Sequence, residues 1–376
     1  MQRRNSALIK FTQFKNLLYP ADQIDEFLKI EMQKQNIPSV SLLITHHGQI
    51  IKKSAYGYCN LDLMVPANPN TVYQIGSIGK QFVATLIMML LEENNIQLDQ
   101  SVSQYLPEVP SGWSNITVRR LLTHTSGIKD YCDYAIENQN PFFNFRLDYT
   151  DDELVNIATA MPLEFSPGEQ WKYSNTGYLL LGIIINRITG IFYGDMLQER
   201  IFKPLGMVHT QIANDTKIIP QRATGYVMKQ NELKVHDYFS PTFNRTADGS
   251  LYSTLEDLSK WDDALRTVKL LKQSSLDLMW TPVTLNNGKT FPYGFGWKLQ
   301  PKCGHKDISH TGSFQGCSGS IDRFVNENIT VIVLTNNEEG GSQLVQGIAP
   351  IVFQSLQLDY QHERGEGFNL SSCRNY

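Results

Sequence analysis

The stretch VYQIGSIGKQFVATLIMMLLEE, residues 72–93, carries the clearest structural signal in the chain. It begins as a short strand-like run, turns at Gly76-Ser77 and continues into the densest apolar segment of the sequence, Phe82–Leu91. That segment is about half as long as a helix that crosses a bilayer. The stretch therefore predicts a turn that opens a buried helix, and no transmembrane span.

The segments on either side predict strands at both ends of the chain and helices between them. Apolar residues at helical spacing favour helices, and short β-rich runs bounded by turn residues favour strands. The expected strands are 39–45, 49–58, 293–299, 307–311, 316–325 and 329–335. The expected helices are 21–36, 82–91, 117–122, 151–159, 176–189, 195–201, 254–266, 274–280 and 343–358. We expect an α/β fold, an antiparallel sheet flanked by helices with a mostly helical inserted domain.

Length sets the expected domain organisation, because 376 residues suggest two domain-sized units or one large composite. A discontinuous sheet domain is expected from 21–84 together with 286–360, and a mostly helical domain from 85–285. An N-terminal extension, 1–20, and a C-terminal tail, 361–376, complete the chain.

Composition bounds the class of protein. Hydrophobic residues make up 41% of the chain and charged residues only 19%, which excludes a charge-driven disordered chain. The 33 basic and 37 acidic residues give a net charge of −4, so the basic excess typical of nucleic-acid binders is missing. We expect a globular protein with a large core and no nucleic-acid partner, and composition leaves its oligomeric state open.

The cysteines and the N-terminus bear on cofactors and compartment. The five cysteines are widely spread and contain no C-x-x-C pair, so neither a metal site nor a redox site is expected. Residues 1–20 are basic but lack the continuous apolar core and the cleavage site of a signal peptide, which favours a surface amphipathic helix. The sequence as written predicts a cytoplasmic protein; a trimmed signal would instead mean a periplasmic or secreted one.

The pattern Ser-x-x-Lys occurs twice, at Ser77-Ile78-Gly79-Lys80 and at Ser126-Gly127-Ile128-Lys129. The second copy lies in a turn sequence with no apolar run behind it, whereas the first opens the buried helix. Residues three apart share one helix face, so Lys80 is expected beside Ser77. A serine hydroxyl needs a base to become a nucleophile, and a buried lysine with a lowered pKa can serve as that base. The alternative is that Ser77 simply caps the helix.

Two further patterns carry residues suited to catalysis. Tyr-x-Asn occurs at Tyr58-Cys59-Asn60, on a strand end, and at Tyr173-Ser174-Asn175, in a loop directly before a buried helix. A loop held by a rigid helix favours the second copy. His310-Thr311-Gly312 lies on an expected strand, where glycine permits a substrate to approach the backbone closely.

Taken in order, these three patterns resemble the motifs of the serine β-lactamase and penicillin-binding protein superfamily. The branch they resemble most contains class C β-lactamases, DD-peptidases and family VIII esterases. Further phrases in the family's order cover most of the chain: LLTHTSGI (121–128), FSPGEQWKYSNTGY (165–178), PLGM (204–207), ADGSLYSTLEDLSKW (247–261) and YGFGW (293–297). The fold of this family agrees with the expected layout of strands and helices.

The resemblance implies a cofactor-independent serine hydrolase that forms an acyl-enzyme on amide or ester bonds of a small molecule or short peptide. It implies that Ser77 is acylated, that Lys80 and Tyr173 share the proton transfers, and that the backbone N–H groups of Ser77 and Ser313 form the oxyanion hole. The implied substrate-binding residues are Asn175, His310, Thr311 and Gly312. Whether Lys80 or Tyr173 is the general base stays open. Peptidase (DD-peptidase or D-aminopeptidase), β-lactamase and esterase activities also stay open.

Two positions depart from the family pattern. Gly79 stands where relatives often carry a hydroxyl residue, and His310 stands where they often carry lysine. A neutral histidine attracts a substrate carboxylate less than lysine does. His124 is expected to be a structural loop residue, and Asp130 and Tyr131 are candidates for the edge of the cleft. The alternative function is a catalytically inactive binding or scaffolding member of the same fold.

Overall fold

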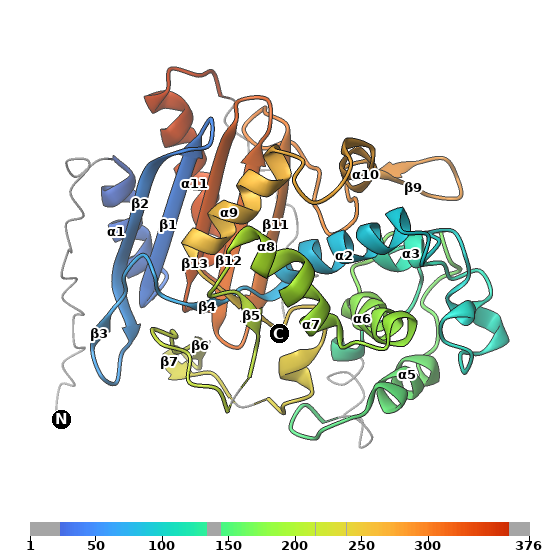
Figure 1. The fold of residues 1–376 in the computed structure, drawn as a ribbon. Coiled ribbons are helices and arrows are strands. Elements are labelled where there is room, and N and C mark those ends of the chain that lie inside the picture. The colour runs from blue at the N-terminus through green and yellow to red at the C-terminus, as the bar shows by residue number, and fades with distance from the viewer. Residues whose placement is uncertain (1–22, 134–143, 215, 238, 361–376) are drawn as a thin grey trace.

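A six-stranded antiparallel sheet, built from both ends of the chain, organises the structure (Figure 1). The computed structural model describes residues 23–133, 144–214, 216–237 and 239–360. The strand order is β11-β12-β13-β1-β2-β3. These strands are β1 (Ser39–His46), β2 (Gln49–Asn60), β3 (Val65–Pro66), β11 (Asp307–Phe314), β12 (Cys317–Phe324) and β13 (Ile329–Thr335). The expected α/β fold class is confirmed, while the expected N-terminal extension and C-terminal tail lie outside the described residues.

The central strands β1 and β13 are buried along nearly their whole length because both faces of the sheet are covered. Leu43 of β1 packs into the core shared with the helical part of the molecule, whereas its neighbour Leu42 packs on the opposite face. The two strands pair in register with Leu42 opposite Val333. The β1–β2 hairpin turns at His47-Gly48, where both residues have positive φ (49° and 74°), as a two-residue hairpin turn requires.

Helices cover both faces of the sheet. On one face lie α1 (Gln23–Lys34) and α11 (Gly341–Ser355), which also contact each other. On the other face lies α9 (Leu255–Arg266), which contacts β1 and β13. Although α9 falls within the range expected for the helical domain, it packs against the sheet, so the proposed domain limits stay a prediction.

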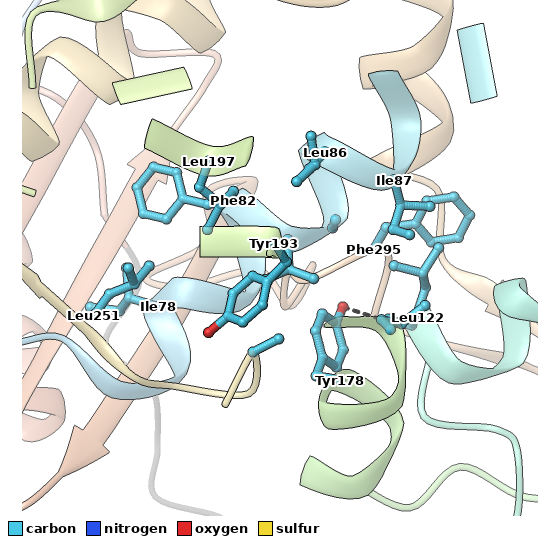
Figure 2. Packing of buried hydrophobic residues seen from close by; sticks show 14 of the residues in the cluster. Ile78, Phe82, Leu86, Ile87, Leu122, Tyr178, Tyr193, Leu197, Leu251 and Phe295 are labelled. Atoms are coloured by element: carbon cyan, nitrogen blue, oxygen red, sulfur yellow. Dashed lines mark hydrogen bonds between the residues drawn. The ribbon is translucent and has the colours of Figure 1, made fainter. Parts of the chain in front are cut away.

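The remaining helices form a body beside the sheet, centred on α2 (Lys80–Glu92). Nearly every residue of α2 is buried, as expected for a core helix that is apolar all round. Figure 2 shows Phe82 and Leu86 of α2 close to Leu197. The helices of this part are α3 (Val118–Leu122), α5 (Asp151–Ala160), α6 (Asn175–Thr189), α7 (Tyr193–Leu197), α8 (Lys203–Leu205) and α10 (Gln273–Met279), with a π-helical turn at Gln198–Phe202.

Short elements join the two parts. The 3₁₀ turns are η1 (Gly76–Gly79), η2 (Val102–Gln104), η3 (Ser111–Trp113) and η5 (Phe243–Arg245). The small sheets combine β4 (Tyr73–Gln74), β8 (Leu251–Ser253) and β5 (Gln211–Ile212); β6 (Tyr226–Lys229) and β7 (Glu232–Val235); and β9 (Val283–Thr284) and β10 (Thr290–Phe291). The β6–β7 hairpin lies in the stretch 213–250, where neither a strand nor a helix is expected from the sequence.

The expected strand 293–299 is also wrong. This segment folds back on itself through an isolated bridge between Tyr293 and Lys298, and Lys298 also bridges to Ser309 of β11. Gly296 between them has φ +76°, a conformation that favours glycine and ends an extended strand. The tight turn brings Tyr293 and Lys298 to the edge of β11.

None of the single helices in the described ranges is long and apolar enough to span a bilayer. The bent pair Asn175–Thr189 and Tyr193–Leu205 reaches that length and composition only when its two members are taken together, with an 83° bend between them.

A buried ion pair attaches α9 to the sheet. Asp262 of α9 accepts hydrogen bonds from Arg323 Nε of β12 at 2.7 Å and from Thr330 Oγ1 of β13 at 3.0 Å. Both charged side chains are only 6% exposed. The Arg323 guanidinium also lies over the ring of Trp280, 5.3 Å from its centroid.

We expect Asp262→Ala to lower the free energy of unfolding by about 3–5 kcal/mol, because it leaves the Arg323 charge buried without its partner. The neighbouring Asp263 forms an exposed pair with Arg266, so Asp263→Ala should cost less than about 1 kcal/mol. Urea unfolding of both variants measures the difference. Equal losses would contradict the anchoring role of Asp262.

Candidate active site

The Ser77-x-x-Lys80 motif lies on the 3₁₀ turn η1, which runs directly into α2. Side chains three residues apart eclipse each other in a 3₁₀ helix. Lys80 Nζ accordingly donates a hydrogen bond to Ser77 Oγ at 2.9 Å. The expected pairing of these two residues is confirmed, although the turn that creates it is 3₁₀ and not α-helical.

The Lys80 ammonium is fully buried and donates to three acceptors from three parts of the chain. Besides Ser77 Oγ, it donates to Asn175 Oδ1 at 2.8 Å and to the backbone carbonyl of Asp248. An ammonium has three N–H donors, and each has a partner here. None of the described carboxylates forms an ion pair with it. Burial lowers the pKa of Lys80 to about 8, and the charges of Asp248 and Asp130 oppose this shift only in part.

Two buried carboxylates support this arrangement from behind. Asp130 Oδ2 accepts the backbone N–H of Asn175 at 2.6 Å, at the N-terminus of α6, where negative charge is stabilised. Burial raises the pKa of Asp130 to about 6. Asp248 Oδ2 accepts a hydrogen bond from the Tyr131 hydroxyl at 2.8 Å. Asp130 and Tyr131, expected at the cleft edge, are therefore buried: Asp130 holds the backbone of Asn175, and Tyr131 holds the side chain of Asp248.

Tyr173 lies against the Lys80 side chain. Lys80 Nζ is 5.0 Å from the centroid of the Tyr173 ring. The Tyr173 hydroxyl is buried and has no well-formed hydrogen bond to another described side chain or backbone group. Burial raises its pKa well above the ordinary value, and the nearby Ser77 hydroxyl opposes the shift. Tyr173 is therefore uncharged at neutral pH.

Glycines allow β11 to touch the turn that carries Ser77. A methyl group on Gly312 would overlap the carbonyl oxygen of Ile75 and lie 2.9 Å from the backbone nitrogen of Ser77. Gly76, with φ +51°, faces the backbone of Ser313 in the same way. The backbone N–H groups of Ser77 and Ser313 thus come from two touching segments, as the expected oxyanion hole requires.

The His310-Thr311-Gly312 motif, the third of the three, places its two polar side chains in different environments. His310 is buried, and both of its ring nitrogens are engaged within the protein: Nε2 with the Tyr293 hydroxyl at 2.9 Å and Nδ1 with the Thr311 carbonyl at 2.6 Å. The Thr311 hydroxyl instead accepts a hydrogen bond from Lys298 Nζ at 3.1 Å. The cation beside this motif therefore comes from residue 298, in place of the family's usual lysine at position 310.

Sequence reasoning brought together Ser77, Lys80, Asn175 and the third motif, but it missed Asp248 and Lys298. It also assigned His124 to a merely structural loop, whereas His124 Nε2 lies 3.1 Å from the Tyr293 hydroxyl inside the site. The phrases ADGSLYS and YGFGW, which contain or directly precede the missed residues, were recognisable signals. Neither phrase indicated what Asp248 or Lys298 does, because the residues that these two contact in the site are distant in the sequence.

The described residues contain no cluster of three or more His, Cys, Asp or Glu side chains that could hold a metal ion. Cys317, beside the third motif, is buried and unpaired, and burial raises the pKa of its thiol to about 12. It is therefore a poor thiolate nucleophile.

A serine hydroxyl bound by a buried lysine, at the junction of an antiparallel sheet and a helical body, defines a serine hydrolase fold of the β-lactamase and transpeptidase type. Residues 24–349 match the family profile described as Beta-lactamase. The chain belongs to this family, which confirms the resemblance seen in the motifs.

Penicillin-binding proteins and a D-aminopeptidase are among the proteins whose sequences are similar to this chain. Penicillin-binding protein 4* of Bacillus subtilis (strain 168) is 32% identical over 315 residues, which are 80% of this chain and 68% of that protein. D-aminopeptidase of Gluconobacter oxydans (strain 621H) is 26% identical over 330 residues, 87% of this chain and 60% of that protein. The chain thus spans about two thirds of the length of these relatives.

Solved structures with the same fold superpose on this chain. An octameric penicillin-binding protein homologue from Pyrococcus abyssi superposes with a TM-score of 0.77 at 27% identity, covering 90% of this chain and 77% of that one. D-amino acid amidase from Ochrobactrum anthropi SV3, complexed with D-phenylalanine, superposes with a TM-score of 0.73 at 25% identity, covering 89% and 98%.

We expect Gly312→Ala to lower kcat for p-nitrophenyl acetate about 100-fold, because the added methyl group would push Ser313 away from Ser77 and weaken the oxyanion hole. Gly112→Ala is the matched control, since a methyl group there meets no atom within 4 Å. Stopped-flow acylation rates measure the effect, and circular dichroism checks the fold. A folded Gly312→Ala variant with unchanged kcat would contradict this placement of the oxyanion hole.

Proposed function

We propose that this chain hydrolyses amide bonds of short peptides that contain D-amino acids, through an acyl-enzyme on Ser77. The observation that carries the proposal is the hydrogen bond from the buried Lys80 to Ser77 Oγ, in a site where burial lowers the pKa of Lys80. The D-aminopeptidase and D-amino acid amidase relatives support the choice of substrate class. Esters and β-lactams are alternative acyl donors for the same chemistry.

In the acylation step, Ser77 Oγ attacks the carbonyl carbon and passes its proton to uncharged Lys80 Nζ. The negative oxygen that develops binds the N–H groups of Ser77 and Ser313. The C–N bond then breaks, and the leaving amine receives the proton from Lys80 through the Tyr173 hydroxyl. Water next attacks the Ser77 ester and releases the acid, which restores the serine hydroxyl.

The environments of Lys80 and Tyr173 divide the proton work between them. With a pKa of about 8, roughly a tenth of Lys80 is uncharged at pH 7. Loss of one proton turns one of its three donors into an acceptor, so Ser77 Oγ can donate across the existing 2.9 Å hydrogen bond. Burial keeps Tyr173 protonated, which suits a group that relays a proton and disfavours a resting phenolate base. We therefore assign Lys80 as the general base.

The pair formed by Thr311 and Lys298 favours a substrate with negative charge on the leaving-group side. Lys298 Nζ donates to the Thr311 hydroxyl at 3.1 Å, and this threonine directly precedes the glycine that contacts the Ser77 turn. A cation beside a partly exposed hydroxyl on an edge strand suits a carboxylate. This supports a peptide with a free terminal carboxylate over a neutral amide or ester.

If uncharged Lys80 is the base, kcat/KM should rise with pH and level off with a midpoint near 8, whereas a lysine with an ordinary pKa would give a rise continuing past pH 10. The charge of Asp130 raises the pKa of Lys80, so Asp130→Asn should move the midpoint to lower pH. The exposed Asp263→Asn is the control and should leave it unchanged. A midpoint that stays in place in Asp130→Asn would argue against Lys80 as the titrating group.

The function itself is tested with a fluorescent penicillin, p-nitrophenyl acetate and the pair N-acetyl-D-alanyl-D-alanine and its C-terminal amide. Wild type should be labelled and should turn over substrate, and Ser77→Ala should do neither. Unchanged labelling of Ser77→Ala would refute the nucleophile, and an inert wild type would favour the binding or scaffolding alternative.

Lys298→Gln should raise KM for the carboxylate peptide about tenfold relative to the amide, as expected for a lost charge-assisted hydrogen bond. Equal effects on the carboxylate peptide and on the amide would refute the carboxylate site.

A further inference from the structure

A continuous chain of hydrogen bonds runs through the protein from the second motif to the third. The backbone N–H of Ser174 donates to His124 Nδ1 at 3.2 Å, and His124 Nε2 lies 3.1 Å from the Tyr293 hydroxyl. That hydroxyl lies 2.9 Å from His310 Nε2, and His310 Nδ1 lies 2.6 Å from the carbonyl of Thr311. The chain crosses from the loop before α6 to strand β11 through residues that are far apart in the sequence.

The two ends of this chain fix which of the two Nδ1 atoms carries a hydrogen. The Ser174 N–H can only donate, so His124 Nδ1 must accept and His124 Nε2 must carry the hydrogen. The Thr311 carbonyl can only accept, so His310 Nδ1 must carry the hydrogen there. Between them the Tyr293 hydroxyl, which also hydrogen-bonds with the Tyr178 hydroxyl, accepts from His124 and can donate to His310 Nε2. In their uncharged forms, His124 is then the Nε2–H tautomer and His310 the Nδ1–H tautomer.

The surroundings oppose any added positive charge on this chain. His124, Tyr293 and His310 are each 1% exposed. Burial lowers the pKa of both histidines well below the ordinary value, and the nearby cations Lys80 and Lys298 lower it further. The other titratable side chains packed against the chain are the tyrosines Tyr173 and Tyr178, which are protonated at neutral pH. The described residues place no carboxylate in contact with either imidazole ring.

We propose that His124 and Tyr293 are positioning residues that hold His310 as the uncharged Nδ1–H tautomer and tie the Tyr173-Ser174-Asn175 loop to β11. His310 then serves as an internal strut with no contact to substrate, and the positive charge of the third motif is supplied by Lys298. Because the chain joins the loop of Tyr173 and Asn175 to the strand that carries Thr311, it fixes the width of the cleft between them.

A merely structural Tyr293 would be replaced without consequence by phenylalanine, which has the same ring. The proposal instead predicts that Tyr293→Phe leaves His124 Nε2–H and His310 Nε2 without their partner. Tyr73→Phe is the matched control, because the Tyr73 hydroxyl is equally buried and hydrogen-bonds two side chains, Ser39 and Ser41, away from this chain.

The first experiment reads the tautomers directly and needs no substrate. Nitrogen-15 NMR of histidine-labelled wild type should show His310 with Nδ1 protonated and Nε2 unprotonated, unchanged between about pH 5.5 and 8. In Tyr293→Phe the His310 Nε2 signal should move to the position of an unprotonated nitrogen that accepts no hydrogen bond, and in Tyr73→Phe it should match wild type. A charged or Nε2–H His310 in wild type, or unchanged signals in Tyr293→Phe, would overturn the proposal whether or not the enzyme cleaves peptides.

The second experiment reads the consequence for catalysis with p-nitrophenyl acetate. Tyr293→Phe should lower kcat/KM about tenfold or more. His124→Gln, which keeps a donor for Tyr293, should retain more activity than His124→Leu. Equal losses in these two variants would reduce Tyr293 and His124 to packing residues.

Discussion

The buried ammonium of Lys80 is the interaction on which the site depends. It is fully removed from solvent, and its three donors are met by the hydroxyl of Ser77, the amide oxygen of Asn175 and the carbonyl of Asp248. Burial without an ion-pair partner favours the uncharged amine and so lowers the pKa of Lys80, while the charges of Asp248 and Asp130 limit this shift. The same burial therefore fixes the geometry of the site and adjusts its basicity toward neutral pH.

Close packing of sheet and helical body makes that burial achievable. The turn that carries Ser77 is covered by β11, and the contact is so tight that no side chain fits at Gly312 or Gly76. The same contact brings the backbone nitrogens of Ser77 and Ser313 close to each other. On the far side of the sheet, α1 and α11 bury the opposite faces of β1 and β13, so the strand that forms the cleft wall is part of a rigid layer.

Charge in the cleft is distributed differently from the family's usual third motif. The residue in the lysine position is an uncharged histidine held inside the protein, and the cation that reaches Thr311 comes from Lys298 on the folded-back segment after Tyr293. Since Lys80 and Lys298 both disfavour protonation of His310, the three positions form one electrostatic unit. A chain of hydrogen bonds with fixed direction joins this unit to the loop of Tyr173 and Asn175.

The sequence by itself determined the local features: the turn before a buried helix, the β1–β2 hairpin, most of the helices and the pairing of Ser77 with Lys80, because each depends on residues that are neighbours along the chain. It also determined the family through three motifs in order. It could not supply the 293–298 fold-back, the packing of α9 on the sheet or the roles of His124, Asp248 and Lys298. The packing of α9 and these roles depend on contacts between residues separated by more than ten positions and often by more than one hundred, and periodicity carries no information about such partners. The fold-back is a local turn at Gly296, but its pairing with Ser309 of β11 is a tertiary contact. Only the tertiary structure decided which groups became buried together, and burial is what sets their charge and their chemistry.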